Sequence, residues 1–197
     1  PERPMLLYFE SGHDLMDDDA LFDFCQKNES FKIERTAEGK VIMHPPTGFE
    51  TGAQNNNISA QLWNWSRLDG RGIAADSSAG YILPNRSERS PDASWILKTK
   101  LEKIPLEQKR KFLPCSPDFV IELRSRSESL TDLCSKMEEY LENGVSLAWL
   151  VDPIEKQLHI YSADRAPLVL NQPPSAKGEG LVSGFELDLR EIWQGLA

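Results

Sequence analysis

Helical and strand periodicities alternate along most of this 197-residue chain. Between residues 129 and 143, apolar side chains recur at positions i, i+3, i+4 and i+7, which predicts an amphipathic helix that Gly144 stops. A strand is predicted before it at 117–123, and the continuously apolar run after it, 145–152, is typical of a strand buried on both faces. Together they predict a β-α-β unit, whose crossover normally joins two parallel strands with right-handed connectivity.

Other elements are predicted on both sides of this unit. Helices are expected at 17–28 and 50–67, with a short one near 105–112. Strands are expected at 31–36 and 40–44, which form a hairpin, and at 72–76, 80–83, 91–97 and 158–162. The 158–162 strand is expected to be an antiparallel neighbour of 145–152, and the tail at 180–193 carries short strand and helix signals. The sequence therefore predicts a mixed sheet in one α/β domain spanning residues 1–197, loosely ordered only over residues 1–16.

Glu122 is the most informative single residue, because it lies in the middle of an otherwise apolar strand. A buried carboxylate needs a partner, a metal ion or a shifted pKa to offset its desolvation. A structural ion pair with Arg124 or Arg126 is the simpler interpretation. Asp118 shares the face of Glu122, but in extended chain their Cα atoms are about 13 Å apart, too far to hold one small ion easily.

A second acid would therefore come from another element, and Asp92 is the best candidate. It lies early in the apolar strand 91–97, where packing alone does not require an acid. Two carboxylates from adjacent strands suit Mg²⁺, which takes oxygen ligands and is usually held by one or two carboxylates plus phosphate oxygens. Such a site would suit phosphodiester hydrolysis.

The net charge of −9 changes this picture, because the surface as a whole should repel nucleic acid. A contact with DNA would need a local basic patch. The run at 98–112 is one candidate, although such runs are often solvated helix faces. Four arginines nearer the two acids are better candidates for phosphate contacts: Arg86, Arg89, Arg124 and Arg126.

The three cysteines lack metal-site spacing and suggest small core residues in a reducing compartment. No apolar stretch approaches the roughly 20 residues of a membrane span, and the apolar patch near the start is too short for a signal peptide. We therefore expect a cytoplasmic protein with no membrane contact.

Three segments together resemble the Uma2 (Uma-two) family of bacterial endonucleases. They are S-P-D-A-S-W at 90–95, S-P-D-F-V-I-E-L-R-S-R-S at 116–127 and K-M-E-E-Y-L-E-N-G-V-S-L-A-W-L-V-D-P at 136–153. The resemblance covers about residues 17–193 and is most specific from 116 to 153. It implies a restriction-endonuclease-like α/β fold of the PD-(D/E)XK superfamily, with a mixed central sheet flanked by helices. It also implies a site of Asp followed by Glu-x-Lys that uses Mg²⁺ or Mn²⁺.

By this resemblance Asp92 is the first acid, Glu122 is the second, and Arg124 stands at the lysine position. This is a departure, because an arginine could stabilise charge on phosphate but would serve poorly as a general base. Related families carry the lysine on the following helix, which implies Lys136, whose ammonium could snorkel toward the sheet. A solvated lysine on the helix flank remains open. Glu50 resembles a helix acid that some members add to the metal site, but an acid is also favoured at any helix N-terminus.

The resemblance implies a metal-dependent endonuclease that hydrolyses DNA phosphodiester bonds. The alternative is a catalytically impaired nuclease-fold module with a nucleic-acid- or protein-binding regulatory role, which Arg124 and the negative charge favour. A homodimer is also expected, because cutting a duplex requires access to two strands and C₂ dimers are the commonest oligomers. Trp63, Trp65 and Trp193 are either interface or core residues.

Overall fold

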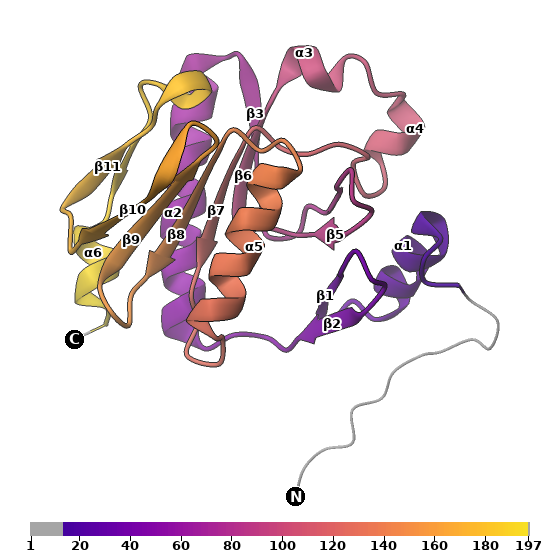
Figure 1. Cartoon of the computed structure of the whole chain (residues 1–197), viewed down its shortest axis with the longest axis horizontal. Coiled ribbons are helices and arrows are strands. Elements are labelled where there is room, and N and C mark those ends of the chain that lie inside the picture. The colour runs from indigo at the N-terminus through magenta and orange to yellow at the C-terminus, as the bar shows by residue number, and fades with distance from the viewer. Residues whose placement is uncertain (1–13, 197) are drawn as a thin grey trace, which may run out of the picture.

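The computed structural model describes residues 14–196 (Figure 1). The expectation of loose order over residues 1–16 falls mainly on residues 1–13, which lie outside the described part. The helices are α1 (Asp18–Lys27), α2 (Phe49–Asp69), α3 (Lys98–Leu101), α4 (Leu106–Lys109), α5 (Leu130–Glu142), the short 3-10 helix η1 (Gly180–Val182) and α6 (Arg190–Gln194). The strands are β1 (Lys32–Arg35), β2 (Val41–His44), β3 (Gly72–Asp76), β4 (Tyr81–Ile82), β5 (Glu88–Arg89), β6 (Ala93–Leu97), β7 (Phe119–Leu123), β8 (Leu147–Asp152), β9 (Gln157–Ser162), β10 (Arg165–Asn171), β11 (Ser175–Lys177) and β12 (Glu186–Asp188).

A six-stranded mixed sheet forms the centre, in the order β10-β9-β8-β7-β6-β3. The β7 and β8 strands are parallel and connected through α5, while the other neighbours in this sheet are antiparallel. This confirms the predicted β-α-β unit and the mixed sheet. It also confirms the predicted antiparallel pairing of the 158–162 segment with β8.

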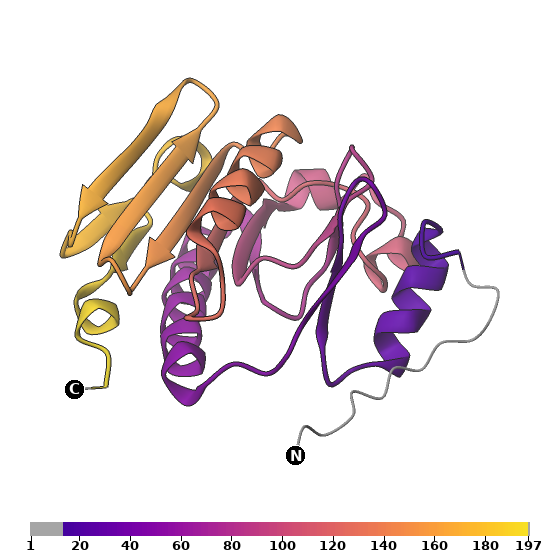
Figure 2. The same ribbon diagram turned by 60° about the horizontal axis from the view of Figure 1, so that its bottom comes forward.

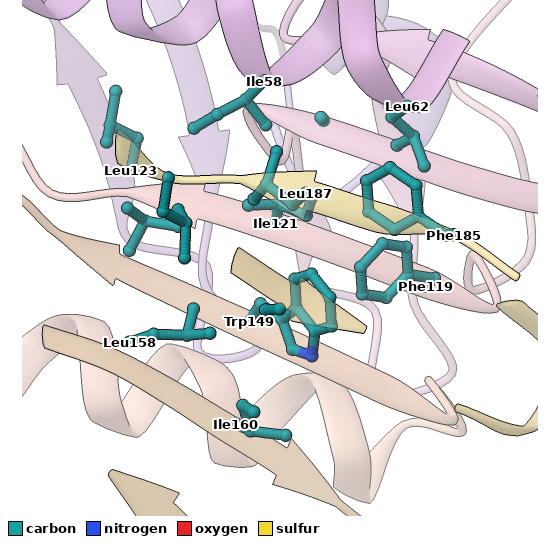
Figure 3. Close-up of a cluster of buried hydrophobic side chains, with 14 of the residues drawn as sticks. Ile58, Leu62, Phe119, Ile121, Leu123, Trp149, Leu158, Ile160, Phe185 and Leu187 are labelled. Carbon is teal, nitrogen blue, oxygen red and sulfur yellow. The ribbon is translucent and has the colours of Figure 1, made fainter. Parts of the chain in front are cut away.

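The two long helices cover opposite faces of the sheet (Figures 1 and 2). On one face, α2 packs Ile58 and Leu62 onto the odd-numbered residues of β7 and β8, as Figure 3 shows. On the other, Leu133, Met137 and Tyr140 of α5 pack against Val120 and its neighbours. Because side chains alternate along a strand, Glu122 lies on the same face as Val120 and is turned toward α5.

A second sheet, β2-β1-β5-β4, stands beside the α5 face and carries α1 on its far side (Figure 2). Four register pairs join β1 to β2, which confirms the predicted hairpin, whereas β1 meets β5 at the single pair Arg35 and Glu88. The buried guanidinium of Arg35 donates to Asp18 and to the carbonyl of Leu15 and so ties the N-terminal helix to this sheet.

The C-terminal segment closes the α2-facing core. It contributes Phe185, just before β12, Leu187 of β12 and Trp193 of α6, and β12 pairs with β11 in a small sheet (Figure 3 shows the first two residues). Trp193 is thus a core residue and Trp65 is partly buried against the same core, but Trp63 is 49% exposed. In the described part of the chain, no helix has the length and apolar character needed to cross a membrane.

Candidate active site

Asp92 and Glu122 lie opposite each other at neighbouring strands. The β6–β7 register pairs Ala93 with Ile121, and one further antiparallel step places Asp92 across from Glu122. The amide of Leu123 donates to Oδ2 of Asp92 over 2.9 Å, which fixes this carboxylate against β7. Opposed residues of an antiparallel pair have Cβ atoms about 4.5–5.5 Å apart. The fold therefore brings together the two acids that the sequence singles out.

Glu122 is almost fully buried, with 2% of its surface exposed. Its Oε1 accepts a hydrogen bond from the hydroxyl of Tyr140 and forms an ion pair with the ammonium of Lys136, each over 2.8 Å. Lys136 and Tyr140 are four residues apart on α5, so one helix face presents both groups. Burial raises the pKa of Glu122, and the positive charge of Lys136 opposes that rise.

Lys136 bridges two carboxylates, because its Nζ also lies 2.8 Å from Oε1 of Glu34. Burial disfavours the ammonium, but Glu122 and Glu34 outweigh it and raise the pKa of Lys136. The side chain therefore stays protonated. It can neutralise negative charge and hold Glu122 in place, but it is unsuited to accept a proton. The solvated alternative for Lys136 does not describe this buried side chain.

The β1–β2 hairpin supplies two further charged groups, Lys32 and Glu34, which alternation places on one face of β1. The Nζ of Lys32 lies 3.2 Å from Oδ1 of Asp92. Glu34 accepts from the amide of Ser90 over 3.0 Å and pairs with Arg89 over 3.3 Å. Burial opposes ionisation of Glu34, yet Lys136, Lys32 and Arg89 together lower its pKa to about 2.

The other candidate residues are engaged differently. Arg124 pairs with Asp152 over 2.7 Å at the end of β8, and Glu50, in the first turn of α2, accepts from the amide of Leu196. In the basic run, Lys100 pairs with Asp118 and Lys111 with Asp19. Among the four arginines named as phosphate contacts, Arg89 pairs with Glu34 and Glu139, Arg86 donates to the carbonyl of Met16, and Arg126 lines the cleft described next.

A cleft of about 790 Å³ opens beside the two acids. Asp92, Lys32 and Asn55 line it, whereas Glu122 and Lys136 are not among its lining residues. The Asn55 amide nitrogen donates to Oδ1 of Asp92 over 3.4 Å. The amide oxygen of Asn55 is buried without a hydrogen-bond partner in the described structure. An oxygen acceptor without a partner, next to a carboxylate, is suited to a cation or a donor group.

The donor set fits a hard divalent cation with few protein ligands. The residues that the structure describes contain no group of three or more histidine, cysteine or acidic side chains able to hold a metal. Two carboxylates, from Asp92 and Glu122, are nevertheless what Mg²⁺ commonly takes from a protein, the remaining ligands being water and phosphate. The unpartnered oxygen of Asn55 adds a neutral acceptor at the same place. Asp92 and Glu122 are therefore the residues that would hold the ion.

The model of the Uma2 family, described as "Putative restriction endonuclease", matches residues 18–190 of this chain. The chain belongs to the Uma2 family. The curated proteins include no match to it. Among solved structures, a crystal structure described as a putative nuclease belonging to DUF820 from Anabaena variabilis aligns with a TM-score of 0.68. The two chains are 18% identical, and the alignment covers 82% of this chain and 89% of the other.

Membership of the Uma2 family and this shared fold support a nuclease function for the chain. They confirm the resemblance found in the sequence and the mixed α/β architecture. Lys32 and Glu34 are residues of the candidate site that sequence reasoning missed. The signal available was the alternation of charged and apolar residues in the hairpin strand F-K-I-E-R. This alternation places Lys32 and Glu34 on one face of the strand, and a hairpin exposed to solvent does not require that arrangement of charges.

Proposed function

We propose that this Uma2 protein is an endonuclease that hydrolyses DNA phosphodiester bonds with Mg²⁺ or Mn²⁺. Asp92 and Glu122 would hold the ion at the base of the cleft. The observation that carries the proposal is that the hydrogen bond from the Leu123 amide holds Asp92, just before β6, next to Glu122 on β7, while Lys136 and Tyr140 fix Glu122 from α5. A bound divalent ion would lower the pKa of a coordinated water and stabilise charge on the reacting phosphate.

The protein side chains would then hold and orient the reacting groups. Lys136 keeps its proton and offsets negative charge on Glu122 and Glu34, the two buried acids that it bridges. Arg126 and Ser125 line the cleft, where they can donate to phosphate oxygens. The guanidinium of Arg124 is bound to Asp152, so we assign it a structural role at the end of β7.

The experiment combines purified protein with single- and double-stranded DNA and RNA in Mg²⁺, Mn²⁺ or EDTA. We expect DNA cleavage that requires the metal and is lost in Glu122→Gln. Glu179→Gln, which alters an exposed carboxylate paired with Arg165, serves as the control and should cleave like the unaltered protein. Cleavage that persists in Glu122→Gln, or no cleavage on any substrate, would contradict the proposal.

A non-catalytic binding module is the second candidate. The charge balance of the cleft favours it, because acids outnumber cations there: Glu29, Glu50, Asp92 and Glu128 against Lys32 and Arg126. A lining of this kind repels a phosphate backbone unless a metal ion is bound. In this case binding assays would detect a protein partner rather than nucleic acid, and neither EDTA nor Glu122→Gln would change that binding.

We further propose that the protein acts as a homodimer through the exposed surface formed by α2 and the edge strand β3. Trp63 is 49% exposed, and Ile73 on β3 is 48% exposed beside it. A large exposed aromatic side chain beside an edge strand is typical of an interface. Light scattering at micromolar concentration should give about twice the monomer mass of 22.3 kDa. The monomer mass would contradict the dimer.

A further inference from the structure

Lys32 lies between the cleft and the buried acid pair. Its side chain is 27% exposed and lines the cleft together with Asp92, to whose Oδ1 it is paired. Glu122 lies deeper, with 2% of its surface exposed. An ion entering from the cleft therefore meets the ammonium of Lys32 before it reaches both carboxylates.

The positively charged ammonium of Lys32 stands where a bound metal cation would otherwise stand, beside Asp92. Although burial disfavours the ammonium, Asp92, Glu122 and Glu34 outweigh this effect and raise the pKa of Lys32. The same two acids, Asp92 and Glu122, are those proposed to hold a divalent ion. An ammonium and a divalent ion repel each other strongly when both are a few ångströms from one carboxylate. The two cations therefore compete for this position.

The way in which the β1–β2 hairpin is attached to the rest of the protein allows the ammonium of Lys32 to move away from Asp92. At its Lys32 end, β1 pairs only with β2, because the pairing of β1 with β5 is restricted to Arg35 and Glu88. The lysine side chain has four rotatable methylene groups, and the cleft beside it offers about 790 Å³. The Nζ atom can therefore move from Asp92 into the cleft without separating β1 from β2.

We propose that Lys32 is a built-in competitor for the divalent ion, which occupies the metal position on Asp92 and sets the metal affinity of the site. This inference rests on the proposed metal site of Asp92 and Glu122. In this arrangement the protein without metal keeps its buried acids neutralised, and binding of the ion is coupled to release of the lysine into the cleft.

Isothermal titration of the whole chain with MnCl₂ tests this inference. Lys32→Met keeps the aliphatic stem and removes the charge, so Mn²⁺ should bind at least tenfold more tightly than to the unaltered protein. Lys100→Met is the matched control, because Lys100, on α3, pairs over the same 3.2 Å with Asp118, just before β7. This control should bind Mn²⁺ like the unaltered protein. Lys32→Gln provides a second neutral side chain, and circular dichroism checks the fold of each variant.

A second readout is the metal-induced rise in melting temperature, which should be larger in Lys32→Met and Lys32→Gln than in the unaltered protein. Equal or weaker Mn²⁺ binding by both folded Lys32 variants would overturn the inference. If the unaltered protein binds Mn²⁺ and Glu122→Gln does not, that result would leave the proposed metal site intact. Absence of Mn²⁺ binding in every protein would overturn both the inference and the metal site.

Discussion

Glu88 should make the stability of this protein fall as the pH rises. The side chain is on β5 and is 0% exposed; its Oε1 accepts from the hydroxyl of Ser90 over 3.0 Å. Its Oε2 is buried with no hydrogen-bond partner in the described structure. Burial, and then the negative charge of Glu34, raise the pKa of Glu88 from 4.5 to about 8. The carboxyl is therefore mostly protonated in the folded state at pH 7.

The folded state binds this proton more tightly than the unfolded chain does. Its contribution to stability is fully present below about pH 4.5, falls as the pH rises, and is lost above about pH 8. A difference between 4.5 and about 8 corresponds to at most about 5 kcal/mol at 1.36 kcal/mol per pKa unit. Glu88→Gln removes the titration but keeps an oxygen that can accept from Ser90.

Urea denaturation of both proteins at pH 5 and pH 8.5 measures this effect. The two stabilities should be similar at pH 5, and Glu88→Gln should be more stable by several kcal/mol at pH 8.5. Taking the difference between the two proteins cancels other groups that titrate in this range, including His44 and His159. A difference that does not change with pH would refute the assignment of a buried, protonated carboxyl.

Four further substitutions test the packing and the ion pairs by urea denaturation. Lys136→Met leaves two buried carboxylates without their shared cation and should destabilise the fold by about 3–5 kcal/mol; a loss below 1 kcal/mol would mean that the acids are not ionised. Tyr140→Phe removes one hydrogen bond to a buried carboxylate and should lose about 1.5–3 kcal/mol; no loss would exclude that bond. Gly72→Ala places a methyl group against the indole of Trp95 and should lose about 1–3 kcal/mol, whereas Gly52→Ala, in open space on α2, should gain up to about 1 kcal/mol; equal effects would contradict this packing.

Local patterns were sufficient to predict much of the fold and to single out some of the residues that meet in the candidate site. The strand periodicity around Glu122 gives way to a clear helical periodicity after it, so the β-α-β unit could be predicted, together with the face of the strand on which Glu122 lies. Asp92 was found by the same argument, since each acid interrupts an apolar strand. Lys136 could be assigned to the edge of the α5 stripe, one turn before Tyr140.

The parts that could not be predicted depend on long-range contacts or on exposed strands. Lys32 is 60 residues from Asp92, and Glu34 is 102 residues from Lys136, so no local spacing indicates either pair. The β10 strand is exposed along nearly its whole length and therefore has no apolar alternation. Arg124 follows the last residue of β7, and the parallel pairing with β8 brings Asp152 within its reach.

Anomalous diffraction from crystals soaked in MnCl₂ would locate a metal ion at the two acids directly. We predict an anomalous peak between the carboxylates of Asp92 and Glu122, with the ammonium of Lys32 moved away from Asp92 into the cleft. Lys136 should remain between Glu122 and Glu34. A peak at another position, or a fully soaked crystal in which Lys32 still contacts Asp92 and no metal lies between the two acids, would contradict it.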